Sequence, residues 1–142
     1  LRDSFDGTTI TTDIMVGFPG ETEEDFAASL EFAKKVAFEK VHVFPYSIRP
    51  GTPAAKMQNQ VDKSEKERRA SLMSTACDNI RYNFLENQIG KILDVLIEDY
   101  HGGFAQGYTA NYTPVKIACE NIHGFVKAEI IGVDGDYCIG KI

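Results

Sequence analysis

Long hydrophobic runs are absent from this sequence of 142 residues. No apolar stretch approaches the roughly 20 residues that a membrane-spanning helix requires, so we expect no role in a membrane. The first residues, LRDSFDGT, lack an initiator methionine and also lack the basic, apolar and small-residue zones of a signal peptide. We therefore expect a cytoplasmic segment of a longer protein.

Cysteine is scarce, and acidic residues outnumber basic ones. Cys77, Cys119 and Cys138 lie 42 and 19 residues apart, which matches neither a C-x-x-C metal pair nor an even-numbered disulfide framework. We interpret them as structural thiols in a reducing compartment rather than as metal ligands. The net charge of -6 argues against a general polyanion-binding protein, because non-specific affinity for nucleic acids comes mainly from Lys and Arg. Any contact with RNA therefore has to be local.

The first part of the sequence has the pattern of a strand, a helix and a second strand. Residues 9–17, TITTDIMVG, alternate in polarity and are rich in β-branched side chains, which predicts a strand. Thr22 and Asp25 form a variant of the capping box, and an apolar stripe follows to a helix end near Val36. Residues 40–46, KVHVFPY, predict the second strand. The three elements together have the size of a βαβ unit in a parallel sheet.

Two irregular stretches come directly after the predicted strands, GFPGE at 17–21 and PYSIRPGTPA at 45–54. In parallel α/β folds the carboxyl ends of the strands form the ligand-binding edge. The second stretch offers an aromatic ring to stack and a guanidinium to bind a carboxylate or phosphate. The alternative is structural, with GFPGE as a tight βα turn, Arg49 as a solvated charge and Tyr46 as a core residue with a hydrogen-bonded hydroxyl. GFPGE is neither a Walker loop nor a G-x-G-x-x-G fingerprint, so phosphate cradling is poorly supported.

Residues 62–89 predict one long helix, for which Gly90 is a natural stop. Its apolar stripe, which we expect to pack on both flanking parts, consists of Met73, Cys77, Ile80 and Phe84. The mixed charges of residues 63–69 predict a solvated face. A basic edge that faces RNA is the alternative, and its members would be Lys66, Arg68, Arg69 and Arg81.

From Lys91 onward the pattern changes to five short strands separated by turns such as HGG and DGD. Spacing of about ten residues predicts a five-stranded barrel that resembles an OB-fold. Tyr108 and Tyr112 could stack on nucleotides, and Asn111 and Lys116 offer polar contacts. Residues 90–142 contain four Lys, no Arg and seven acidic residues, a local charge of -3, which departs from a strongly basic RNA-binding domain.

Taken together, these stretches resemble one known family. TTDIMVGFPGETEEDF, followed some twenty residues later by VHVFPYSIRPGTPAAKM, closely resembles the last part of the radical SAM barrel of methylthiotransferases. The long helix, GKILDVLIED and GFAQGYTANYTPVKI resemble the family's linker and its C-terminal TRAM domain. The implied fold class is α/β followed by all-β. Residues 1–61 would be the last βα units of a partial, TIM-like radical SAM barrel, 62–89 a linker helix and 90–142 a five-stranded, OB-like TRAM barrel that binds RNA.

The resemblance also implies cofactors and sites. The full-length enzymes use S-adenosylmethionine and two 4Fe-4S clusters. The C-x-x-x-C-x-x-C ligands of the radical SAM cluster are missing from this sequence, as are the cysteines of the second cluster, which an N-terminal domain supplies, so we expect no catalytic residue here and no activity of this segment alone. By motif position, the cofactor-binding residues would be Asp13, Val16, Gly17, Phe18, Pro19, Glu21, Phe44, Tyr46, Ser47 and Arg49. The RNA-binding residues would be Tyr108, Asn111, Tyr112 and Lys116.

The loops look most like those of members that methylthiolate C2 of N6-threonylcarbamoyladenosine at position 37 of tRNA. The resemblance therefore implies the anticodon loop of tRNA as the partner, and we expect a monomer. One alternative is the family branch that methylthiolates an aspartate of a ribosomal protein. A second is a non-catalytic RNA-binding module, in which both loops are structural turns.

Overall fold

The computed structural model describes residues 1–5 and 7–142. They form two compact units, one of residues 10–81 and one of residues 1–9 with 82–142. The longest helix, α2 (Lys63–Glu86), contributes to both units. Among the described residues, no helix is both long and apolar enough to cross a membrane.

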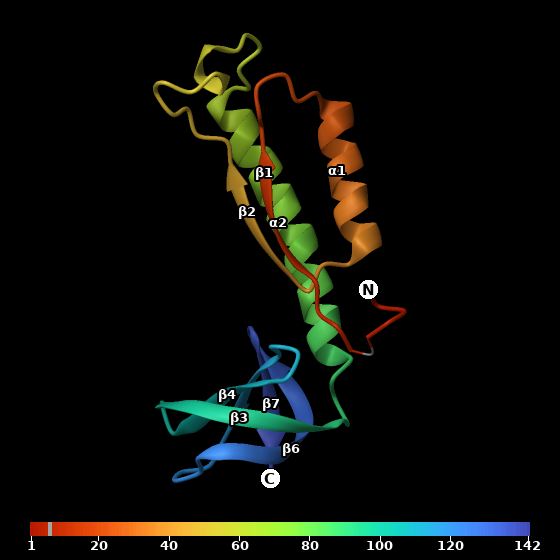
Figure 1. Ribbon diagram of the computed structural model, residues 1–142, viewed down its shortest axis with the longest axis vertical. Coiled ribbons are helices and arrows are strands. Elements are labelled where there is room, and N and C mark those ends of the chain that lie inside the picture. The colour runs from red at the N-terminus through yellow and green to blue at the C-terminus, as the bar shows by residue number, and fades with distance from the viewer. Residues whose placement is uncertain (6) are drawn as a thin grey trace. The chain divides into compact units, whose positions relative to one another are not determined.

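The unit of residues 10–81 begins with a βαβ unit, as the sequence predicts (Figure 1). Strand β1 (Thr11–Val16) and strand β2 (Lys40–Pro45) pair in parallel, with Thr11 opposite Lys40 and Val16 opposite Pro45. Helix α1 (Glu23–Val36) connects them and ends at the predicted residue. Because the strands are parallel, the chain leaves both of them at the same edge of the sheet.

The predicted capping box at the start of α1 is confirmed. Thr22 Oγ1 accepts a hydrogen bond from the Asp25 amide at 3.1 Å, and the Asp25 carboxylate accepts one from the Thr22 amide at 3.0 Å. Ala37, with φ 53°, ends the helix in the left-handed conformation. A cap of this kind contributes about 1 kcal/mol, so these few residues fix where the first loop ends.

Helix α2 covers the βαβ unit with the first half of its predicted apolar stripe. Met73 and Cys77 are buried together with Val16 of β1 and with Phe26 and Ala33 of α1. Further along the stripe, Phe84 packs against the core of the other unit. The helix ends at Glu86, three residues earlier than the sequence predicts. Two consecutive turns then carry the chain to Gly90.

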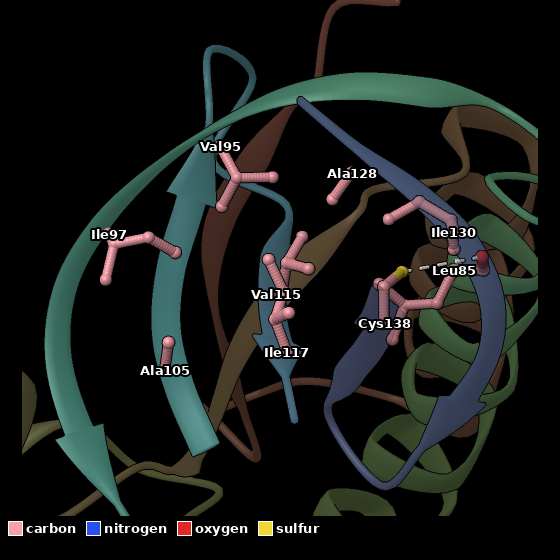
Figure 2. Close-up of a cluster of buried hydrophobic side chains, with 9 residues drawn as sticks. All are labelled: Leu85, Val95, Ile97, Ala105, Val115, Ile117, Ala128, Ile130 and Cys138. Carbon is pink, nitrogen blue, oxygen red and sulfur yellow. Dashed lines mark hydrogen bonds between the residues drawn. The ribbon is translucent and has the colours of Figure 1, made fainter. Parts of the chain in front are cut away.

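The predicted five-stranded barrel is confirmed. Its strands are β3 (Ile92–His101), β4 (Phe104–Thr109), β5 (Pro114–Ile117), β6 (Gly124–Asp134) and β7 (Tyr137–Lys141). They close in the order β3-β4-β5-β7-β6, and all neighbours are antiparallel except β5 and β7. Figure 2 shows the core inside this ring, which consists of Leu85, Val95, Ile97, Ala105, Val115, Ile117, Ala128, Ile130 and Cys138.

Candidate functional site

The two irregular loops lie side by side at the carboxyl edge of β1 and β2 (Figure 1). The Tyr46 amide donates to the Val16 carbonyl at 2.8 Å, which continues the parallel ladder into the second loop. The Gly20 amide donates to the Asn59 carbonyl at 2.9 Å, so the end of the second loop folds back on the first. The sequence placed both loops at this edge, and the structure joins them by hydrogen bonds.

Gly17 is the residue on which the shape of the first loop depends. Its φ is 72°, and a Cβ built on it would lie 2.2 Å from Lys66 Cγ, so any other residue would be strained and would displace the Lys66 side chain. Its amide donates to both carboxylate oxygens of Glu21, each at 3.0 Å. The Gly17 amide is therefore occupied by the loop's own carboxylate.

A buried guanidinium connects this loop to α2. Arg69 is 5% exposed, and its Nη1 donates to Glu21 Oε1 at 2.6 Å and to the Glu21 carbonyl at 3.0 Å. Its Nε donates to Glu65 Oε1 at 2.7 Å, one helical turn earlier. Arg69 thus holds Glu21, and Glu21 in turn holds the amide of Gly17.

The prediction that residues 63–69 form a solvated face is wrong at Arg69, which is buried by its partner from the first loop. The alternative of a basic edge that faces RNA stays a prediction, although the guanidiniums of the three arginines already pair with carboxylates. Arg68 binds Glu23 and Glu65, and Arg81 binds Glu39. Apart from Glu65 on the same helix, the partners Glu23, Glu21 and Glu39 lie 42 to 48 residues away, so helix periodicity could not reveal them.

The charge cluster makes stability depend on acid pH. Hydrogen bonds from Arg68 and Arg69 lower the pKa of Glu65 to about 2 from an ordinary 4.5. A carboxylate with a lowered pKa stabilises the fold above its unfolded value, and that contribution is lost as the pH falls from 4.5 towards 2. We expect the urea midpoint of the wild type to fall over this range more steeply than that of Glu65→Gln. Parallel curves for the two proteins would contradict the pairing.

Tyr46 and Phe18 connect the two loops through their rings. Their centroids are 5.3 Å apart in an edge-to-face arrangement at 69°, and Lys66 Nζ lies 5.6 Å from the centroid of Tyr46. The Tyr46 hydroxyl is buried and has no hydrogen-bond partner among the described residues. The structural alternative for Tyr46 required a bonded hydroxyl, whereas an unpaired buried hydroxyl favours an external partner.

The sheet leaves one of its faces open. Ile14, Val16, Val41 and Val43 pack towards the helices. Because side chains alternate along a strand, the opposite face carries the register pairs Asp13 with His42 and Met15 with Phe44. Met15 is 45% exposed and Phe44 is 40% exposed. These two side chains leave apolar surface exposed on this face of the sheet.

The predicted cofactor residues therefore separate into three sets. Val16, Gly17, Pro19 and Tyr46 are buried beneath the edge, and Glu21 braces the loop from within. The exposed members at the edge and on the open face are Asp13, Phe18, Phe44, Ser47 and Arg49. Asp13 also borders a hollow of about 550 Å³ between β1 and α1, whose other lining residues include Phe32 and Phe38. The sequence analysis did not predict that Lys66 and Arg69 of α2 contact the two loops. The basic composition of residues 63–69 was the only signal for them.

The loop between β4 and β5 carries two of the four predicted RNA-binding residues, Asn111 and Tyr112, and Tyr108 lies near the end of β4. Tyr108 is 41% exposed and Tyr112 is 77% exposed, and their ring centroids are 6.3 Å apart. Tyr112 has a φ of 60°, a conformation that costs a non-glycine residue of order 1 kcal/mol and turns its ring into solvent. The two rings offer an exposed aromatic surface for stacking.

Asn111 supports this loop through its own side chain. Its Oδ1 accepts hydrogen bonds from the hydroxyls of Thr109 and Thr113, at 2.5 and 2.9 Å. Its Nδ2 donates to the Gly7 carbonyl at 2.8 Å, and its carbonyl accepts from Thr9 Oγ1 at 3.0 Å. Three of its four side-chain hydrogen-bonding positions are thus used within the same unit.

The three cysteines belong to the hydrophobic cores of the two units or to their margins. Cys77 lies in the core of residues 10–81, whereas Cys138 lies in the core of the barrel and Cys119 at its margin. Burial, followed by the nearby charge of Asp78, raises the pKa of the Cys77 thiol. In the described ranges, no three His, Cys, Asp or Glu side chains are arranged to hold a metal ion. These thiols do not suit an iron-sulfur cluster.

Comparison with known proteins gives relatives along the whole chain, although no family model matches it. A threonylcarbamoyladenosine tRNA methylthiotransferase from Bacillus subtilis is 34% identical over 99% of this chain and 33% of its own length. A tRNA-2-methylthio-N6-dimethylallyladenosine synthase from Caldicellulosiruptor saccharolyticus is 34% identical over 100% and 31%. A second threonylcarbamoyladenosine enzyme, from Thermotoga maritima, is 43% identical over 86% and 28%. The chain thus spans about a third of the length of these curated relatives.

Proposed function

The chain belongs to the methylthiotransferase family and matches the C-terminal portion of its relatives, and from this premise we propose that it works within a tRNA-modifying enzyme. The reaction is methylthiolation of C2 of N6-threonylcarbamoyladenosine at position 37 of tRNA. The observation that carries the proposal is a match over 99% of the chain, which includes both edge loops and the barrel. We propose the anticodon loop as the partner and a monomer as the working state.

The open face of β1 and β2 supports a role in holding S-adenosylmethionine. Phe18 and Phe44 offer exposed apolar surface for an adenine ring, and the Tyr46 hydroxyl lacks a partner among the described residues. Arg49 is the guanidinium at this edge that suits a carboxylate. When bound, S-adenosylmethionine supplies the methyl group. We assign Glu21 to positioning of the loop, because its carboxylate is already shared between Gly17 and Arg69.

The family's iron-sulfur clusters find no ligand set in the described residues, where no three His, Cys, Asp or Glu side chains could hold a metal ion. We therefore derive no step through them from this chain. We propose that residues 1–61 complete a radical SAM barrel, that 62–89 link it and that 90–142 are a TRAM domain. The closed five-stranded barrel supports the last assignment.

The substrate is tested by mass spectrometry of tRNA nucleosides from cells that lack the gene for the parent protein. Loss of the methylthio group from threonylcarbamoyladenosine, with accumulation of its precursor, supports the proposal. Loss from dimethylallyladenosine instead would support the second candidate, which the match to the Caldicellulosiruptor synthase favours. An unchanged profile would overturn both and leave the ribosomal protein or a binding module.

The cofactor role of the edge predicts a separation of effects. In cells that carry the gene with Arg49→Ala in place of the wild type, tRNA methylthiolation should fall below about a tenth of the wild-type level, as expected when a charge-assisted hydrogen bond is lost. The affinity of the variant for tRNA should stay within about twofold of the wild-type value. Lys40→Ala is the matched control, because Lys40 is an exposed cation at the opposite, amino end of β2. Equal modification by both variants would rule out a role for Arg49 in the reaction.

A further inference from the structure

Lys116 lies between two aromatic rings on the outer surface of the barrel. Its Nζ is 5.5 Å from the ring centroid of Phe104 on β4 and 5.7 Å from that of Tyr137 on β7. Its strand neighbours Val115 and Ile117 point into the core, so Lys116 points outwards. The lysine side chain is only 17% exposed, because the rings cover its sides. The rings thus hold the ammonium group in one place.

One carboxylate already compensates this charge. Asp134, at the end of β6, forms an ion pair with Lys116. The Asp134 side chain is 68% exposed and adjoins the turn into β7, so it can leave the ammonium group at little cost. The arrangement thus combines a cation that is held in place and mostly covered with an exposed carboxylate that can move away.

Lys116 also lies close to the exposed tyrosines. It pairs with Gln106 of β4, and Tyr108 is two residues further along the same strand, on the same outer side. Two residues of a strand span about 7 Å. A single RNA strand that stacks a base on Tyr108 therefore brings its backbone within reach of Lys116.

We propose that Lys116 binds a phosphate of the RNA backbone and that Asp134 competes with this phosphate, so that RNA binds here by displacing Asp134. The inference rests on the proposed function, because it takes tRNA as the ligand. Carboxylate and phosphate make the same kind of charge-assisted hydrogen bond to an ammonium group. Asp134 thereby lowers the affinity for any polyanion, and only RNA that also stacks on the tyrosines gains enough to displace it.

The test is the affinity of an unmodified tRNA transcript with adenosine at position 37 for the protein and its Asp134→Asn variant. Without the competing charge, we expect binding to be about fivefold tighter, the upper range for a partly exposed ion pair. The slope of log affinity against log salt should also become steeper by about 0.8, because the Lys116–phosphate contact then forms without breaking an ion pair within the protein. Lys116→Ala should cost about twofold in the wild type and about tenfold in the Asp134→Asn background, so that Asp134→Asn brings no gain once Lys116 is absent.

Asp94→Asn is the matched control. Asp94 pairs with Lys127 across β3 and β6, and both side chains are more than 60% exposed. The Asp94→Asn substitution removes the same charge from the barrel as Asp134→Asn does. It should nevertheless change the affinity for tRNA by less than about twofold and leave the salt slope unchanged. Equal gains from Asp134→Asn and Asp94→Asn, or a gain that survives Lys116→Ala, would overturn the inference. If the wild-type protein binds no tRNA even at low salt, the proposed function is wrong, and the inference that rests on it is wrong as well.

Discussion

Replacing Gly107 by alanine should unfold the barrel. A Cβ on Gly107 would lie 1.9 Å from the Leu96 carbonyl oxygen and 2.7 Å from its carbon, on the neighbouring strand β3. Backbone cannot yield as a flexible side chain does, so we expect a loss of about 3 kcal/mol or more in the free energy of unfolding. The readout is labelling of the Cys138 thiol at increasing urea concentration, because Cys138 is fully buried in the barrel core.

Gly132→Ala provides the control for this variant. Gly132 lies on β6, and a Cβ there would meet no atom within 4 Å. We expect a change within about 0.5 kcal/mol. If Gly107→Ala protects Cys138 as well as Gly132→Ala does, the close approach of β3 to β4 is not as described.

Replacing Arg69 by methionine should have the second large effect, this time on residues 10–81. The change leaves the Glu21 carboxylate, whose side chain is 15% exposed, without its cation. Breaking a buried ion pair from one side costs about 3 kcal/mol. Cys77 is the thiol to follow, because it is 5% exposed and lies in the core of this unit.

Arg68→Met separates burial from charge. Arg68 precedes Arg69, also pairs with Glu23 and Glu65 and also lies over the Phe26 ring, but its side chain is 44% exposed. We expect a clearly smaller loss than for Arg69→Met, because an ion pair of an exposed side chain contributes little to stability. Adding Glu21→Gln to Arg69→Met should restore part of the loss, because the uncompensated charge disappears. Equal costs for the two arginine variants would show that Arg69 is not a buried brace.

Local patterns predicted most of the fold. The alternation in residues 9–17, the Thr22 and Asp25 box and the turns between the later strands each depend on residues close in sequence. Such features can be read because propensity, periodicity and capping act over a few residues. The carboxyl-edge location of both loops followed from the same reasoning.

Partners far apart in sequence could not be predicted. Arg69 reads as a surface charge until Glu21, 48 residues earlier, is brought beside it. Asn111 reads as a free polar group until its amide is seen to bind Gly7, 104 residues away. The pairing of Lys116 with Asp134 likewise depends on which strands of the barrel adjoin. The sequence shows the charge of each side chain, whereas the fold determines which side chain of opposite charge lies next to it.

The parallel pairing of β5 with β7 has a consequence for synthesis of the chain. Val115 pairs with Cys138, 23 residues later, and β7 is the strand that joins β5 to β6. A nascent chain that has not yet reached Tyr137 therefore exposes edges of β5 and β6 that other polypeptides could pair with. Non-local pairing of this kind is slow. The barrel thus depends on late translation of residues 137–141, and a ribosome that stalls before them leaves a sheet prone to aggregation.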